Sequence, residues 1–179
     1  MKKQEIMRLL AEHHQAFTKN LDTLSDEDFE RTPGTKWTAG QQLDHILKSV
    51  IPVAKAFNSP LEVLESKFGL SEKPSRSYTQ LVEDYLMVLQ KLKDFVLPER
   101  FVPHPLSAEN KSTKFEELVQ TIFLLNQGLR HFEEETLDTH SIFHPAMGKL
   151  SLREILYFTI YHVTHHEKQI QKNLNDHPV

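Results

Sequence analysis

Five long segments of the chain carry apolar residues at every third or fourth position, which is the spacing of one face of an α-helix. The segments cover residues 3–21, 39–57, 78–96, 114–137 and 152–174. No segment alternates strictly between apolar and polar residues over the length of a strand, so the pattern disfavours an α/β fold. Helices of this length bury their apolar faces best against one another, and we therefore predict an all-α fold in which they form an antiparallel bundle.

The residues at the ends of the segments and between them agree with a helical bundle. Three residue pairs at helix starts have the spacing of a capping box, in which the two residues satisfy each other's free backbone amides: Thr38 with Gln41, Thr113 with Glu116, and Ser151 with Glu154. Pro52 lies inside the second segment and allows a kink or an early end there. The linkers at 31–36, 71–77, 98–112 and 139–150 are too long for a minimal up-and-down bundle, so we expect crossover loops. We expect a single domain over residues 1–179.

The composition restricts the chemistry. The chain has 11 histidines and no cysteine, which excludes disulfides, thiolate nucleophiles and metal sites that need sulfur. The formal net charge of −4 disfavours general nucleic-acid binding, because that function uses a basic face. No run of about 20 apolar residues and no signal peptide is visible. We therefore expect a cytoplasmic protein with no membrane partner.

Two histidine pairs have a spacing of four residues, and their contexts differ. His162 and His166 extend the apolar stripe of the last segment, so their rings lie one helical turn apart and could converge on one metal ion. They could equally be two buried histidines, each hydrogen-bonded to a carbonyl or hydroxyl group. His140 and His144 lie in an expected loop before Pro145, and we interpret their spacing as coincidence.

A third ligand would have to come from another segment. His45 lies at the border of the apolar stripe of the second segment, beside Leu43 and Ile46. A side chain there could reach a cleft in a bundle. A lone histidine in such a place is more typical of a structural role.

Two stretches of the chain resemble a known family. Residues 37–46, WTAGQQLDHI, resemble the Trp-Ser/Thr…Leu-x-His segment of the DinB-like family, and residues 161–170, YHVTHHEKQI, resemble its His-x-x-x-His-x-x-Gln-Ile signature. The resemblance implies a four-helix bundle with long crossover loops and an additional helix. It also implies a divalent metal held by His45, His162 and His166, with His165 as a non-ligand between them. Glu167 and Lys168 replace the Arg-Gly of many members, which makes the surrounding pocket less predictable.

Three neutral imidazoles suit Zn²⁺ or Ni²⁺ and leave positions open for water or substrate. The resemblance implies a metal-dependent hydrolase in which this site activates water toward a small-molecule substrate. An alternative is a thiol S-transferase that uses a low-molecular-weight thiol such as bacillithiol, mycothiol or glutathione. Two further alternatives are a non-catalytic metal-binding stress-response protein and a bundle whose histidines are only structural. The resemblance leaves homodimerisation open.

The residues around the three histidines provide no evident catalytic base. Gln169 lies three residues after His166 and could either orient a ligand from behind or pack at the bundle edge. Asp44 precedes His45 and is either a surface residue or a support for the ligand. Trp37, just before a capped helix, is most simply a hydrophobic staple.

Overall fold

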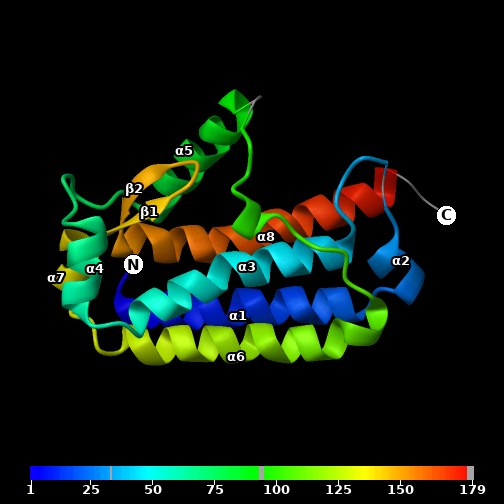
Figure 1. Cartoon of the computed structure of the whole chain (residues 1–179), viewed down its shortest axis with the longest axis horizontal. Helices are drawn as coiled ribbons and strands as arrows, with labels where there is room; N and C mark the ends of the chain where they lie inside the picture. Colours follow the sequence, from blue (N-terminus) through cyan, green and yellow to red (C-terminus); the bar gives the residue numbers. More distant parts are fainter. Residues whose placement is uncertain (33, 93–94, 177–179) are drawn as a thin grey trace.

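Four long helices lie side by side and form the body of the molecule (Figure 1). They are α1 (Lys3–Asp22), α3 (Ala39–Phe57), α6 (Lys111–Leu129) and α8 (Leu152–Asp176). α1 contacts α6 and α8, and α3 contacts the same two helices, so each helix has two neighbours in the bundle. The computed structural model describes residues 1–32, 34–92 and 95–176. The predicted all-α four-helix bundle is confirmed.

Shorter elements fill the segments between these helices. They are α2 (Asp26–Glu30), α4 (Leu61–Phe68), α5 (Tyr78–Lys91), α7 (Glu134–Thr139), the 3₁₀ turns η1 (Glu99–Phe101) and η2 (Ala108–Asn110), and strands β1 (Ser141–His144) and β2 (Gly148–Ser151). α5 packs on α8 outside the bundle and is the additional helix (Figure 1). None of the helices in the described ranges is long and apolar enough to cross a membrane.

Two of the three predicted capping boxes are present. Thr38 Oγ1 accepts a hydrogen bond from the Gln41 amide, and Gln41 Oε1 accepts one from the Thr38 amide, both at 3.0 Å. Ser151 and Glu154 exchange the same pair of bonds at 3.1 and 2.9 Å. Because these bonds are local, they define the starts of α3 and α8 where the sequence places them. α3 continues through the exposed Pro52.

The prediction of one helix over residues 114–137 is wrong. The chain forms α6 and then α7, and α6 begins at Lys111, upstream of the predicted cap at Thr113. A distant lysine stabilises the end of α6, because Lys3 Nζ donates to the carbonyl oxygens of Arg130 and Phe132 at 3.1 and 2.7 Å. This contact is not visible in a local sequence pattern.

The linkers also hold structure that the sequence did not indicate. β1 and β2 form an antiparallel hairpin in which Ser141 pairs with Ser151. Strands of four residues are too short to show a clear alternation, so this hairpin was predicted as loop. The predicted helix over 78–96 ends at Lys91, and residues 93–94 of that segment lie outside the described residues.

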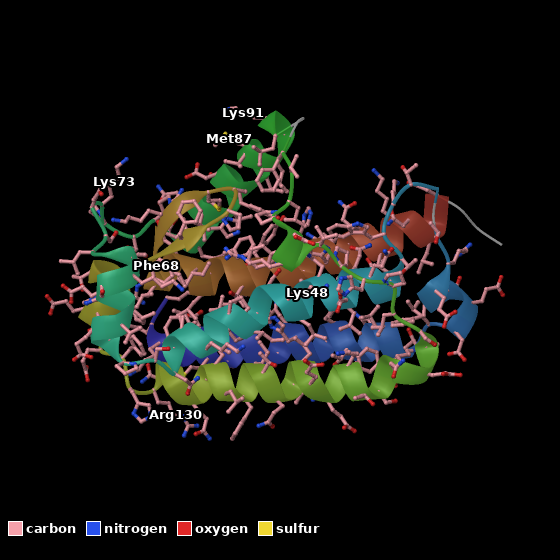
Figure 2. The ribbon with its side chains drawn as sticks, in the orientation of Figure 1. Lys48, Phe68, Lys73, Met87, Lys91 and Arg130 are labelled. Carbon is pink, nitrogen blue, oxygen red and sulfur yellow. The ribbon has the colours of Figure 1, made fainter. Side chains whose placement is uncertain are left out.

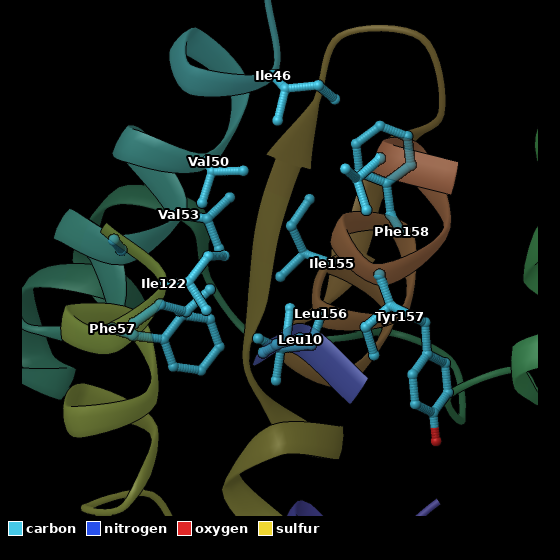
Figure 3. Close-up of a cluster of buried hydrophobic side chains, with 14 of the residues drawn as sticks. Leu10, Ile46, Val50, Val53, Phe57, Ile122, Ile155, Leu156, Tyr157 and Phe158 are labelled. Carbon is cyan, nitrogen blue, oxygen red and sulfur yellow. The ribbon is translucent and has the colours of Figure 1, made fainter. Parts of the chain in front are cut away.

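Buried apolar side chains from all four long helices meet in the core. Figure 3 shows Leu10 of α1 and Ile122 of α6 in one cluster with Val50 of α3 and with Ile155 and Leu156 of α8. This packing holds α3 and α8 against each other. Their shared border carries the histidines.

Candidate metal centre

Three buried histidines converge at the border of α3 and α8. Nε2 of His162 lies 3.3 Å from Nε2 of His45 and 3.0 Å from Nε2 of His166. Among the described residues this is the group whose nitrogen ligands lie close enough to share an ion, all within 4.8 Å of one another. Nitrogens that bind one zinc ion tetrahedrally at about 2.0–2.1 Å lie about 3.3 Å apart, close to the two separations observed.

Partners behind the rings orient two of the three histidines. Nδ1 of His45 donates to the backbone oxygen of Phe101 at 2.8 Å, and Nδ1 of His166 donates to Oε1 of Gln42 at 3.0 Å. In a neutral imidazole the other nitrogen then carries a lone pair, and in both rings this nitrogen faces the centre. His162 can donate a proton to only one of its two neighbours. The donor set therefore fits a divalent cation.

The environment favours the neutral form of all three rings. Burial lowers the pKa of all three histidines, and for His162 and His166 the charges of neighbouring histidines lower it further. For His45, the hydrogen bond to Phe101 and the charge of Asp44 act in the opposite direction but do not outweigh burial. Metal binding requires the neutral imidazole, so these shifts favour ligation.

Asp44 supports the site from a distance. Its Oδ2 accepts a hydrogen bond from the His104 amide at 2.7 Å and pairs with Lys48 Nζ at 2.8 Å. Lys48 also donates to the carbonyl oxygen of Val102 at 2.7 Å. Together the two side chains hold the segment whose Phe101 carbonyl oxygen accepts a hydrogen bond from His45. Asp44 therefore acts on the position of the backbone, and its described hydrogen bonds do not reach the three rings.

A pocket of about 660 Å³ opens directly over the histidines. Its lining comes from α3 and α8, from α4 and α5, from the segment between Phe95 and Phe101 and from the β1–β2 hairpin. Figure 1 shows how these elements are arranged. The lining extends along α3 from His45 to Ala56 and on to Phe68 at the end of α4, which is labelled in Figure 2. The described residues that line it include no aspartate or glutamate.

Trp37 covers the histidine cluster. Its ring centroid lies 5.0 Å from that of His45, and it stacks on His166 at 6.3 Å with an interplanar angle of 11°. Its place in the sequence predicts only a hydrophobic staple at the start of α3. Its place in the pocket wall shows that it also shields the rings from solvent.

His144 lines the same pocket from β1. Its Nδ1 accepts hydrogen bonds from the backbone amides of Ala146 and Met147 at 3.2 and 3.1 Å, so in the neutral ring Nε2 carries the proton. Burial lowers its pKa to about 4. His144 is therefore a neutral hydrogen-bond donor beside the cluster, a role that the spacing with His140 did not indicate.

Tyr85 of α5 also lines the pocket. Burial, and to a smaller extent the neighbouring Tyr161, raise the pKa of its hydroxyl group, which stays protonated. The hydroxyl forms no hydrogen bond with any described residue. It is available to a bound molecule.

Other candidates from the sequence lie away from the centre. Gln169 is exposed on α8 and forms no hydrogen bond with the described part of the chain, whereas the amide that reaches His166 belongs to Gln42. Gln42 stands three residues before His45 on the same helix face, and this spacing could have identified it. His140 lies near Glu65, with 3.6 Å between Nε2 and Oε2, and is not part of the cluster.

Comparisons with known proteins agree with this fold. The family model of the DinB superfamily matches residues 9–170. YfiT from Bacillus subtilis, described as a probable metal-dependent hydrolase with an unusual four-helix bundle topology, is 17% identical with a TM-score of 0.61, and the match covers 98% of this chain and 87% of that one. A conserved protein from Enterococcus faecalis is 18% identical with a TM-score of 0.60, over 97% and 95% of the two chains. No curated protein matches. At these identities the two structures are evidence for the fold alone.

Proposed function

The chain belongs to the DinB superfamily, and from that premise we propose that it is a metal-dependent hydrolase that acts on a small molecule. The observation that carries this proposal is the convergence of His45, His162 and His166 in the wall of a large pocket. The description of YfiT as a probable metal-dependent hydrolase with the same fold supports it.

Zn²⁺ or Ni²⁺ suits the donor set best, because neutral imidazole is a preferred ligand of both. When bound by three neutral ligands, such an ion keeps its full charge and can lower the pKa of water toward neutrality. This chemistry fits a pocket whose described lining has no carboxylate to serve as a base.

The protein's own groups have three tasks in this proposal. Phe101 and Gln42 hold two of the rings with Nε2 toward the ion. Trp37 and the apolar walls exclude bulk water, which strengthens electrostatic interactions in the pocket. His144 and Tyr85 offer neutral N–H and O–H donors to an oxygen atom of the substrate.

Thiol transfer is a second candidate function, and the same absence of a carboxylate among the described lining residues favours it. A thiol that coordinates a metal is deprotonated by the ion itself and needs no protein base. The chain has no cysteine, so the sulfur would have to come with a small-molecule thiol.

Metal analysis of the full chain, purified without a histidine tag, tests the proposal. We expect about one equivalent of Zn²⁺ or Ni²⁺ in the wild type, and at least tenfold less in His45→Ala, His162→Ala and His166→Ala, because two imidazoles hold the ion weakly. His140→Ala is the matched control and should keep its metal.

Metal content below about a tenth of an equivalent, not restored by added Zn²⁺ or Ni²⁺, would contradict both candidate functions. Equal loss in His140→Ala would indicate destabilisation of the fold in place of lost ligation. Two measurements on the metal-loaded protein distinguish the candidate functions. Cleavage of chromogenic esters indicates hydrolysis, and a rise in melting temperature with added thiol indicates thiol binding.

A further inference from the structure

The pocket over the histidines is long and follows two helices. Its α3 wall runs from His45 to Ala56 and its α8 wall from Ile155 to His166. Each stretch advances about 16 Å at 1.5 Å per residue. The two helices run in opposite directions (Figure 1), so the histidines of both lie at the same end of the trough.

Beyond the histidines the walls are mostly apolar. The apolar lining residues at this far end are Pro52, Val53 and Ala56 of α3, Val63, Leu64 and Phe68 of α4, and Ile155 of α8, and Lys55, Ser59 and Lys67 line it as well. Leu89, Phe95 and Leu97 cover the trough from above. The apolar part of this surface stabilises a hydrocarbon chain through burial from water.

The charges on the pocket have one sign. Among the described lining residues the charged side chains are Lys55 and Lys67, toward the far end, and Arg100, next to the Phe101 whose carbonyl oxygen accepts a hydrogen bond from His45. A bound anion therefore meets attraction and no repulsion from a carboxylate. A positively charged ligand would find no partner there.

We propose that the ligand of this site is a linear acyl compound of about a dozen carbons, which matches the length of the trough. Its carboxylate or acyl carbonyl group lies at the three histidines, and its alkyl chain lies along α3 and α8 toward α4. The length of the trough and its mostly apolar walls select the alkyl chain, and the proposed ion, with Arg100 at the histidine end, selects the acyl head group. The inference rests on the proposed metal function, because the head group is placed at the ion.

Calorimetry with straight-chain carboxylates from butanoate to tetradecanoate, below their micellar concentrations, tests this on the zinc-loaded full chain. We expect binding to tighten about three- to fourfold per methylene group and then to level off near a dozen carbons, where the trough ends. Removal of zinc should weaken binding at every chain length, because the head group loses its partner.

A variant at the far end sharpens the test. Ala56→Phe fills the trough about one turn from Val53, so binding should level off about four carbons earlier, with unchanged zinc content and unchanged butanoate binding. Ala16→Phe, on the exposed face of α1, is the matched control. Its affinity for carboxylates should depend on chain length as in the wild type. Val63→Trp replaces Ala56→Phe if that variant fails to fold, because Val63 lines the same end and is 52% exposed.

The outcomes separate this inference from the proposed function. A protein that holds about one equivalent of zinc but binds all chain lengths equally would overturn the acyl ligand and leave the metal site standing. The inference is also overturned if the affinity of Ala56→Phe for carboxylates depends on chain length as in the wild type. A protein that takes up no zinc contradicts the proposed function, whatever its affinity for carboxylates.

Discussion

Gln42 and His45 lie three residues apart on α3, so both side chains project from one face of that helix. His45 turns its own Nε2 toward the cluster, while Gln42 reaches across to Nδ1 of His166 on α8. Each helix thus contributes a ligand candidate, and α3 also orients the ring of its neighbour. Gln42 is only 3% exposed, so its amide has little access to water as an alternative partner.

The support that Gln42 gives to His166 can be measured. Gln42→Leu keeps the approximate volume but removes the acceptor of the Nδ1 proton, so zinc affinity should fall about 10- to 100-fold. Competition with a chromogenic chelator measures this change. Gln169→Leu is the matched control, because Gln169 is exposed and forms no hydrogen bond with the described residues. An equal loss in both variants would contradict the assignment of this role to Gln42.

At the level of the elements, the backbones of α3 and α6 lie close together where α3 ends. A Cβ atom on Gly128 of α6 would lie inside the van der Waals contact distance of the Phe57 carbonyl oxygen. Asn58, just after α3, closes the same junction by donating to the carbonyl oxygens of Ala54 and Leu124 at 2.8 and 2.9 Å. Backbone therefore packs on backbone here, and only glycine leaves enough space.

Gly128→Ala should accordingly destabilise the protein. Alanine gains about 1 kcal/mol in helix propensity, but forcing the two helices apart costs more, so we expect a net loss of about 1–3 kcal/mol in the free energy of unfolding. Urea unfolding measures it. Gln127→Ala, on the exposed side of α6, should change stability by less than about 0.5 kcal/mol. A Gly128→Ala protein as stable as the wild type would show that the junction can relax.

Across the whole molecule, Arg153 of α8 connects the N-terminal residue with α7, far along the chain. Its guanidinium group pairs with Asp138 at 2.6 Å and Glu134 at 2.9 Å, and it donates to the carbonyl oxygen of Met1 at 2.9 Å. The amino group of Met1 in turn donates to the Tyr157 hydroxyl at 2.9 Å. The N-terminus, α7 and the start of α8 are thereby held together at one end of the bundle.

The stability of the whole fold should also depend on pH through His14 of α1. Burial, followed by the charge of His13, lowers its pKa to about 4 against the opposing hydrogen bond to Leu10, and its Nε2 has no partner among the described residues. Between pH 6.5 and about 4 the unfolded chain binds a proton at this position and the folded chain does not. The free energy of unfolding therefore falls as the pH falls through this window.

Replacing His14 isolates this contribution. Between pH 6.5 and 4, the free energy of unfolding should fall less in His14→Leu than in the wild type, by up to about 3 kcal/mol. The reason is that leucine takes up no proton when the chain unfolds. Urea unfolding at pH 7, 5.5 and 4 checks the difference. His131→Gln, at an exposed position, should leave the wild-type dependence unchanged. The prediction fails if His14→Leu and the wild type lose stability in parallel.

Much of this molecule could be predicted from local patterns. Apolar stripes and capping boxes depend on contacts within three or four residues, so the limits of α1, α3 and α8 were predicted within two residues. The proximity of His162 and His166 is also a local feature, because residues four apart in a helix always lie about one turn apart. The resemblance in two short stretches added the four-helix arrangement and the choice of His45 as the third candidate ligand.

Other features depend on packing between distant segments. The break between α6 and α7 is stabilised by Lys3 from the other end of the chain, and the hairpin of β1 and β2 is too short to be recognised without its neighbours. Gln42, and not Gln169, reaches His166 because of the way α3 faces α8. The trough over the histidines forms because further segments cover these two helices. Spacing along one helix follows from its 3.6-residue period, but a distance between two helices depends on the side chains and loops that hold them together, and the folded chain alone determines it.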